Sequence, residues 1–412
     1  MYLKKFFFTC IVWSAFAYWA DAQYRYVHDK LQISYDPRLE TYFIAERLVA
    51  ENIGNYVFSN KTFDYSGQPI EMAGFNKFKN YKDSIVILKL SALLDTLKPL
   101  LQDNAPIIEM LLYKEQFPAK GNRYPFKKLM LFDASSHPEV IGLIEQVIEN
   151  LREFYIEAQV GNFLTTNEYF YRGAAKEVEK LINKNIYTYM EDYYGEHFLQ
   201  YIIVVAPAMT LFSDTDSYRG IGPTIHTPAG RISYMILSTS VMLGSQQQPG
   251  TYTHFGFDNS AIIRQLSVHE IGHSFINPHL EKYKQKIESD APLFTPALAA
   301  LMRQQGITSW YVCVTENLVR TGEIRIAMQM KDTAQANWLR QLYVPDQNCI
   351  FIPALEEKID SYERNRTKYP IFENFLPELL TVFDGITPQK VDQMLGKTKP
   401  VRSLNQWEQN FF

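Results

Sequence analysis

Residues 261–273 read AIIRQLSVHEIGH, a segment in which an apolar helical pattern ends in two histidines four residues apart. Its first eight residues contain neither Gly nor Pro, and Leu266 lies on the same helical stripe as His269 and His273. We therefore expect a helix whose histidine face points into the protein. The sequence predicts that this helix stops before Pro278, because proline lacks a backbone N–H and biases the preceding residue away from helical geometry.

The spacing of the two histidines is that of a zinc site. Residues i and i+4 of an α-helix lie one above the other, so His269 and His273 can bind a single Zn²⁺. Glu270 follows the first histidine, where a carboxylate can take a proton from a zinc-bound water. The motif therefore predicts Zn²⁺ as the cofactor, with Glu270 as the catalytic base.

The segment VTENLVR at residues 314–320 extends this pattern. The motif followed by this segment resembles the gluzincins, the thermolysin-like and aminopeptidase-like zinc peptidases, which add a Glu from a later helix. The strings HEIGHSFINP and TENLVR also resemble a family of secreted bacterial proteins of unknown function that are suspected to be metallopeptidases. This second resemblance covers residues 261–325. Together they imply Glu316 as the third zinc ligand and a zincin-like fold.

Three alternatives to Glu316 as the third ligand stay open, and one of them is another residue such as Glu288. Glu316 can instead be an ordinary helix residue that pairs with Arg320 four residues on. His279 lies six residues past His273, an offset that is similar to the metzincin pattern. In that pattern a Gly makes the turn, whereas this chain has Ile276, whose β-branched side chain suits the turn poorly.

Further residues of the site follow from the same chemistry. A side chain that stabilises a developing oxyanion is expected in such an enzyme, and no motif selects between Tyr311, Tyr343, His254 and His279. Asn317 or Glu323 could orient the imidazoles. Substrate-binding residues stay open.

The N-terminus predicts export. Lys4 and Lys5 precede an uncharged run over residues 6–19, and Ala20-Asp21-Ala22 has the small-x-small form of a cleavage site. We predict a signal peptide over residues 1–22 and a periplasmic or extracellular protein. No later segment is long and apolar enough to anchor the chain in a membrane.

The composition of the chain limits the classes of molecule that it is expected to bind. The net charge is −4 and no basic stripe is present, which argues against a nucleic-acid partner. The expected partner is a peptide or protein substrate, and the oligomeric state stays open. Cys313 and Cys349 remain after signal cleavage, and an oxidising compartment would permit them to pair.

The patterns along the chain predict its elements. Helices are expected at 36–52, 138–163 and 175–194, and strands at 84–90, 201–206 and 231–240. After residue 261 nearly everything reads as helix, with helices expected at 280–288, 294–304, 310–330, 333–343 and 353–366. The resemblance to gluzincins implies that the strand at 231–240 offers an open edge to an extended peptide. The alternative is an interior strand with ordinary surface loops on either side.

The predicted fold is therefore α+β. A mixed subdomain with a small sheet, residues 23–260, is followed by a helical subdomain, residues 261–412, with the motif helix at the junction. Both parts are expected to form one catalytic unit. The predicted function is that of a secreted or periplasmic zinc peptidase. The alternatives are a catalytically silent zinc protein that recognises peptides or glycans, and a zinc hydrolase of another amide or ester.

Overall fold

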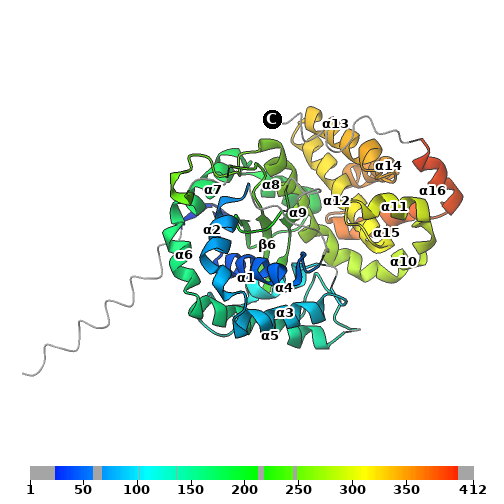
Figure 1. Cartoon of the computed structure of the whole chain (residues 1–412). Helices are drawn as coiled ribbons and strands as arrows, with labels where there is room; N and C mark the ends of the chain where they lie inside the picture. The colour runs from blue at the N-terminus through cyan, green and yellow to red at the C-terminus, as the bar shows by residue number, and fades with distance from the viewer. Residues whose placement is uncertain are drawn as a thin grey trace, which may run out of the picture.

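The computed structural model describes residues 24–58, 67–101, 103–135, 137–211, 218–244 and 248–397. The predicted signal peptide over residues 1–22 lies outside these ranges. Within them the fold is α+β, as predicted: the N-terminal half holds a small sheet and the C-terminal half is helical (Figure 1). Among the described residues, no helix combines the length and the apolar character needed to cross a membrane.

A six-stranded mixed sheet lies inside the N-terminal half. Its strands are β1 (Arg25–His28), β2 (Leu31–Ser34), β3 (Gln200–Val205), β4 (Gly220–Ile221), β5 (Thr224–Thr227) and β6 (Gly230–Leu237). The strand order is β1-β2-β3-β6-β4, and β5 also pairs with β6. Strands β2, β3 and β6 are parallel, whereas β1, β4 and β5 are antiparallel to their neighbours.

The two strands predicted at 201–206 and 231–240 are β3 and β6, but β6 does not have the open edge expected of it. It pairs with β3 on one side and with β4 and β5 on the other. The apolar run of β3 is buried on both faces, which is typical of a central parallel strand. The outer position beside β6 belongs instead to the short strands β4 and β5.

Helices surround this sheet. They are α1 (Pro37–Ile53), α2 (Pro69–Phe78), α3 (Ile85–Leu97), α4 (Ala105–Tyr113), α5 (Glu139–Glu157), α6 (Val160–Thr166), α7 (Glu168–Leu181), α8 (Ile186–Tyr194) and α9 (Ser260–Leu280). Helix α7 packs against β2 and β3, and α9 packs against β6. Helix α9 carries the two motif histidines, so the sheet supports one side of the helix that holds two of the predicted zinc ligands.

The strand predicted at 84–90 is wrong, because these residues begin helix α3. Ser84 caps the helix by accepting a hydrogen bond from the backbone N–H of Ile87. The buried residues Val86, Leu90, Leu94 and Leu97 follow the helical period, and α3 packs against α5 and α1. Packing of this face outweighs the β preference of the branched residues at its start.

Three predicted helix boundaries are also corrected. The helix expected over 138–163 breaks at Gln159, which has a left-handed backbone, so α5 and α6 are separate. The helix expected over 175–194 is interrupted between Leu181 and Ile186, where α7 ends and α8 begins. Helix α9 continues through Pro278 to Leu280, and the proline lies so near the C-terminus that only two residues of the helix follow it.

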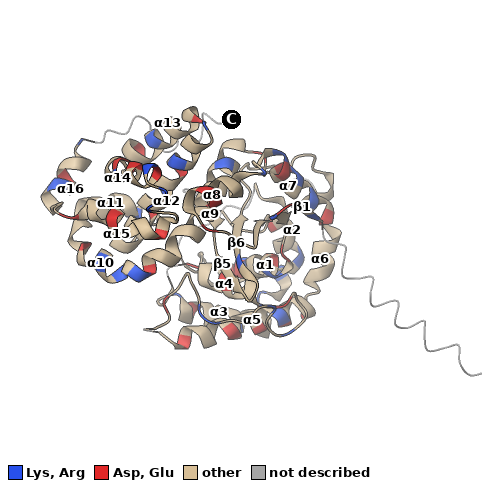
Figure 2. Ribbon diagram, turned by 180° about the vertical axis from the view of Figure 1, so that it is seen from behind, with Lys and Arg blue, Asp and Glu red and all other residues tan. Residues whose placement is uncertain are grey.

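The C-terminal half consists of helices, as predicted. They are α10 (Lys284–Ser289), α11 (Pro296–Arg303), α12 (Trp310–Gln329), α13 (Thr333–Gln341), α14 (Ile352–Arg364), α15 (Leu376–Leu379) and α16 (Pro388–Leu395). Acidic and basic residues are interspersed along them (Figure 2).

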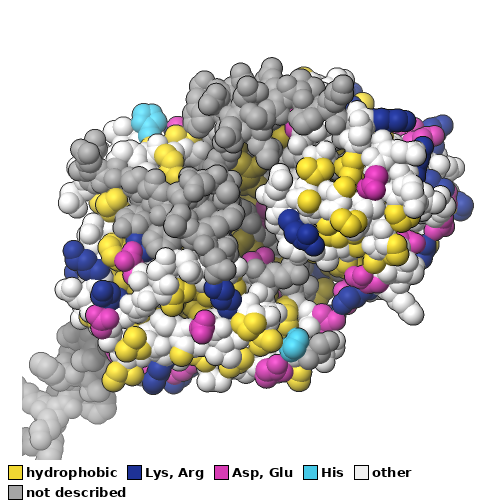
Figure 3. Space-filling model, turned by 45° about the vertical axis from the view of Figure 1, so that its right-hand side comes forward, with side chains coloured by type: hydrophobic (Ala, Val, Ile, Leu, Met, Phe, Trp, Pro, Cys, Tyr) yellow, Lys and Arg dark blue, Asp and Glu magenta, His cyan; other side chains and the backbone are white. Residues whose placement is uncertain are grey.

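One cluster of buried apolar side chains runs through both halves, from Leu31 in the sheet to Val391 in α16. A second, smaller cluster joins α12, α13 and the start of α14. The surface is hollowed between the two halves (Figure 3). The shared core holds α9 and α12 in contact at the junction, and these are the helices that carry the predicted metal ligands.

Candidate metal centre

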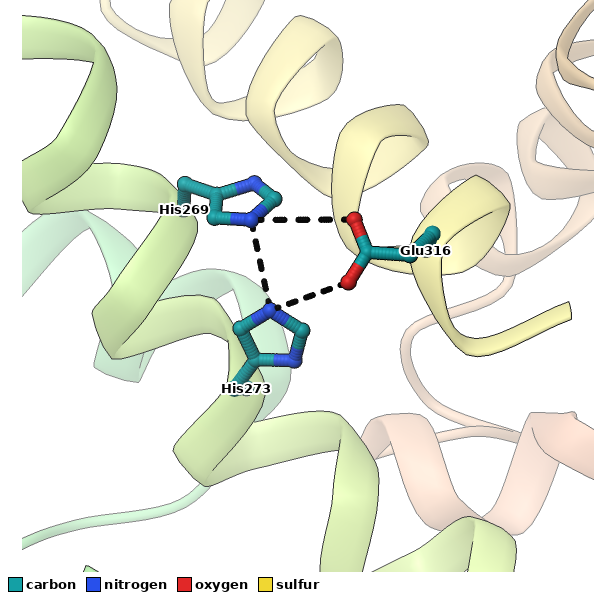
Figure 4. A group of neighbouring side chains, drawn as sticks. All are labelled: His269, His273 and Glu316. Atoms are coloured by element: carbon teal, nitrogen blue, oxygen red, sulfur yellow. Dashed lines mark hydrogen bonds and ion pairs between the residues drawn. The ribbon is translucent and has the colours of Figure 1, made fainter. Parts of the chain in front are cut away.

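Helix α9 presents the two motif histidines side by side. Asn259 caps its start, because its side chain accepts hydrogen bonds from the backbone N–H groups of Ala261 and Ile262. Ten residues further on, His269 and His273 project from one face one turn apart, as the i, i+4 spacing predicts (Figure 4). Their Nε2 atoms lie 3.3 Å from each other.

Helix α12 brings Glu316 to the same point. The Oε2 atom of Glu316 is 3.7 Å from Nε2 of His269, and its Oε1 atom is 3.4 Å from Nε2 of His273 (Figure 4). One ligand atom from each of the three residues lies within 4.8 Å of the other two. In a tetrahedral site with bonds of about 2.0–2.1 Å, neighbouring ligand atoms are about 3.3 Å apart, which these separations approach.

The other ring nitrogen of each histidine faces an acceptor. Nδ1 of His269 lies 2.8 Å from Oε1 of Glu323, and Nδ1 of His273 lies 3.1 Å from Oδ1 of Asn277. Acceptors in these positions favour the tautomer with hydrogen on Nδ1. In that neutral tautomer each Nε2 atom directs its lone pair to the centre, as a metal ligand must.

A chain of hydrogen bonds continues outward from Glu323. The hydroxyl of Tyr343 donates to Oε2 of Glu323 over 2.6 Å, and Nε2 of Gln265 donates to that hydroxyl over 3.1 Å. The hydroxyl of Tyr218 donates to Oε1 of Gln265 over 2.9 Å. The side chain of Glu323 is only 1% exposed, so these partners fix its carboxylate behind His269.

Arg320 supports the third carboxylate. Its Nε atom is 3.4 Å from Oε2 of Glu316, so the i+4 pair considered from the sequence also forms. Burial raises the pKa of a carboxyl, but the two histidines and Arg320 outweigh burial and lower the pKa of Glu316. Cys349 accepts from Nη1 of Arg320, and both Cys349 and Cys313 are buried free thiols.

Glu270 is buried against the backbone of β4. A Cβ atom built on Gly220 would lie 2.4 Å from Oε1 of Glu270, and one built on Gly222 would lie 2.4 Å from its backbone oxygen. Burial raises the pKa of Glu270. The imidazoles of His269 and His273 oppose this rise, and the negative charge of Glu316 adds to it. A carboxyl with a raised pKa beside a candidate metal centre is suited to accept and return a proton.

The carboxylates also act on the first histidine. Burial lowers the pKa of an imidazole, but Glu323, Glu316 and Glu270 outweigh burial and raise the pKa of His269 to about 9. Without a cation the ring therefore carries a proton at neutral pH, and a metal ion that binds here must displace it.

His279, the alternative ligand, lies apart from this cluster. Its Nε2 atom contacts Glu196, and its Nδ1 atom is 3.3 Å from Oε2 of Glu373. Because α9 continues past Pro278, a residue six positions after His273 lies on another side of the helix.

The remaining predicted residues are those expected to orient the imidazoles and those expected to stabilise an oxyanion. Glu323 supports His269 as proposed, whereas Asn317 donates to the backbone oxygen of Cys313. The oxyanion candidates have other partners: Tyr343 bonds to Glu323, Tyr311 interacts with Glu281, and His254 contacts Thr253.

Besides Gln265 and Tyr218, three contributors had not been predicted. Asn277 lies four residues after His273, and this i+4 spacing is a signal that the sequence did contain. Gly220 and Gly222 lie in a glycine-rich stretch, but nothing in the order of residues placed them against Glu270.

Comparison with known families shows to which family the chain belongs. It belongs to the family described as "Domain of unknown function (DUF4932)", whose sequence profile matches residues 36–382. Neither the curated proteins nor the solved structures contain a match to it.

Proposed function

We propose that the chain is a zinc-dependent peptidase that is exported after cleavage of a signal peptide. The observation that carries the proposal is the convergence of His269, His273 and Glu316, with one ligand atom from each within 4.8 Å of the others. Two imidazoles and one carboxylate are a ligand set of catalytic zinc sites, in which the fourth position is kept for water. The residues therefore fit the metal in kind, number and separation.

Zinc held by these residues would polarise the scissile carbonyl and lower the pKa of a bound water. Glu270 follows His269 in the chain, and its charge interacts with those of both histidines and Glu316. It would accept the proton of the attacking water and pass it to the leaving amine. Glu323 would keep the ring of His269 in the binding tautomer.

The substrate class follows from the same chemistry. A buried base beside a water-activating metal suits hydrolysis of a peptide bond, so the expected partner is a peptide or an unfolded protein segment. The same groups could act on another amide or on an ester, and a chain that binds zinc without turnover would use them for recognition alone. Activity measurements separate these cases.

The central experiment uses purified mature protein. We expect about one zinc ion per chain and cleavage of members of a peptide library. Glu270→Gln should lower cleavage by a factor of at least about 100 while zinc content stays unchanged. A protein that takes up no zinc during purification or reconstitution would refute the proposal. Zinc binding with hydrolysis only of esters or non-peptide amides would refute the peptidase assignment.

A matched pair of substitutions tests the ligand set. Glu316→Ala should weaken zinc binding strongly, whereas His279→Ala should leave it near that of the wild type, because His279 contacts Glu196 and Glu373 instead. Zinc affinity measured by competition with a chelator gives the answer. Loss of zinc from His279→Ala alone would mean that the ligand set is wrong.

A further inference from the structure

A cavity lies behind the motif helix. It has a volume of about 370 Å³ and opens between the end of α7, the start of α8, and helices α9, α12 and α13. The break between α7 and α8 forms one wall, through Ile182 and Ile186. The cavity therefore exists because the chain is not a continuous helix from residue 175 to residue 194.

The cavity is separate from the face of α9 that holds the catalytic base. Val268 lines the cavity and Glu270 lies against β4, two residues further along the helix. At about 100° per residue, their side chains leave α9 in nearly opposite directions. A molecule in the cavity would therefore not occupy the space beside Glu270.

Just over half of the residues that line the cavity are apolar, and the others are polar or charged. Ile326, Ala327 and Leu339 face the cavity together with Ile182, Ile186 and Val268. Ala327 and Leu339 belong to the small apolar cluster, whereas Ile186 belongs to the main core, so the cavity lies where the two clusters meet. Its size is within the range of small-molecule sites in proteins.

A cationic group stands at the rim. Arg264 lines the cavity and is exposed, and within the described part of the chain no carboxylate lies within ion-pair distance of it. The acidic residue at the rim, Asp332, uses its carboxylate to cap α13 by accepting from the backbone N–H of Gln335. Glu323 forms part of the wall, with its oxygens bonded to His269 and Tyr343. Arg264 is therefore the one cation among the residues that line the cavity, and the two lining carboxylates, Asp332 and Glu323, are held by the contacts given above.

We propose that this cavity binds a small apolar carboxylate, such as a medium-chain acyl or arylalkyl acid. The apolar chain would contact the residues at the junction of the two clusters, and the carboxylate would pair with the guanidinium of Arg264. Binding here does not require that the chain be a peptidase.

Calorimetric titration with decanoate tests the site. Wild-type protein should bind decanoate with saturation. Met330→Trp, which places a larger side chain on the cavity wall, should weaken binding by about tenfold or more. Met328→Trp is the matched control, because Met328 lies on the same helix, is 38% exposed and does not line the cavity.

Two further variants test the charge. Arg264→Gln should weaken decanoate by about three- to fivefold and leave binding of decan-1-ol unchanged. The control Arg303→Gln, at the exposed end of α11, should affect neither ligand. Absence of saturable decanoate binding, or equal binding by the two tryptophan variants, would overturn the proposal. Decanoate held at the candidate metal centre would survive Met330→Trp and count against it. An unchanged affinity in Arg264→Gln would overturn the assignment of a carboxylate.

Discussion

At the scale of single residues, Glu323 connects the histidines to the rest of α12. It accepts from Nδ1 of His269 and from the hydroxyl of Tyr343, and it is almost fully buried. We predict that Glu323→Ala lowers zinc affinity by about 10- to 100-fold, because the ring of His269 loses its orienting partner. A chelator competition titration measures this change.

The control for this substitution is Glu357→Ala, which removes an exposed carboxylate from α14. It should leave zinc affinity unchanged. If Glu323→Ala bound zinc as tightly as this control, the contact with His269 would have no part in holding the metal.

Residue types and spacing allowed part of the site to be predicted. The i, i+4 rule places His269 and His273 together, and a ligand count of three calls for a residue such as Glu316. The roles of Tyr343 and Gln265 could not be predicted in this way. These roles depend on how α9, α12 and α13 pack against one another. The sequence alone does not distinguish a tyrosine hydroxyl that supports a carboxylate from one that contacts a substrate.

At the scale of elements, the short strand β4 and the residue after it fit closely against α9 because glycines stand at positions 220 and 222. A Cβ at position 220 would meet the end of the flexible Glu270 side chain. A Cβ at position 222 would meet the backbone oxygen of Glu270 at 2.4 Å and also Oε2 of its side chain at 2.8 Å. A side chain can move aside, but a helix backbone in a packed core cannot easily do so. The two glycines should therefore respond differently to substitution.

If the proposed function holds, we predict that Gly220→Ala keeps its stability and zinc content and lowers peptidase turnover by about 10- to 100-fold, because the carboxylate of the proposed base, Glu270, is displaced. Gly222→Ala should instead lower the free energy of unfolding by about 1–3 kcal/mol. Turnover, bound zinc and urea unfolding measure these effects.

Gly142→Ala is the matched control, since a Cβ there meets nothing within 4 Å and the residue lies inside α5. It should preserve turnover and stability. Full activity in Gly220→Ala would show that the position of the Glu270 carboxylate is not limiting.

The elements themselves were predicted where burial and period agreed. The run in β3 is apolar on both faces, and α12 is long and begins with a Ser cap. The strand predicted at residues 84–90 was wrong because a short apolar run is compatible with a strand or a helix. The contact with α5 decides in favour of the helix. The break between α7 and α8 has no Pro or Gly to mark it.

At the scale of the whole molecule, buried carboxyls make stability depend on pH. Glu40 is fully buried in α1 and accepts a hydrogen bond from Tyr171. Burial is the main cause that raises its pKa to about 8, against an ordinary value of 4.5. Between these values the folded state holds a proton that the unfolded state releases, so the stabilising contribution is present at low pH and is lost as pH rises toward 8.

We predict that the free energy of unfolding of the wild type falls relative to that of Glu40→Gln between about pH 5 and pH 8. The difference should reach at most about 1.4 kcal/mol for each pH unit. Urea unfolding at several pH values measures it. Glu157→Gln, at an exposed position of α5, should keep the pH dependence of the wild type. A Glu40→Gln variant with that same dependence would contradict the prediction.

The contact between β4 and α9 also bears on how members of the family differ from one another. The space beside position 220 is closed by the side chain of Glu270, whereas the space beside position 222 is closed by backbone that any residue at 270 would supply. A relative that has lost this carboxylate is free to replace the first glycine but not the second. The pair of residues at these positions is therefore expected to distinguish relatives that have kept a carboxylate at position 270 from those that have lost it.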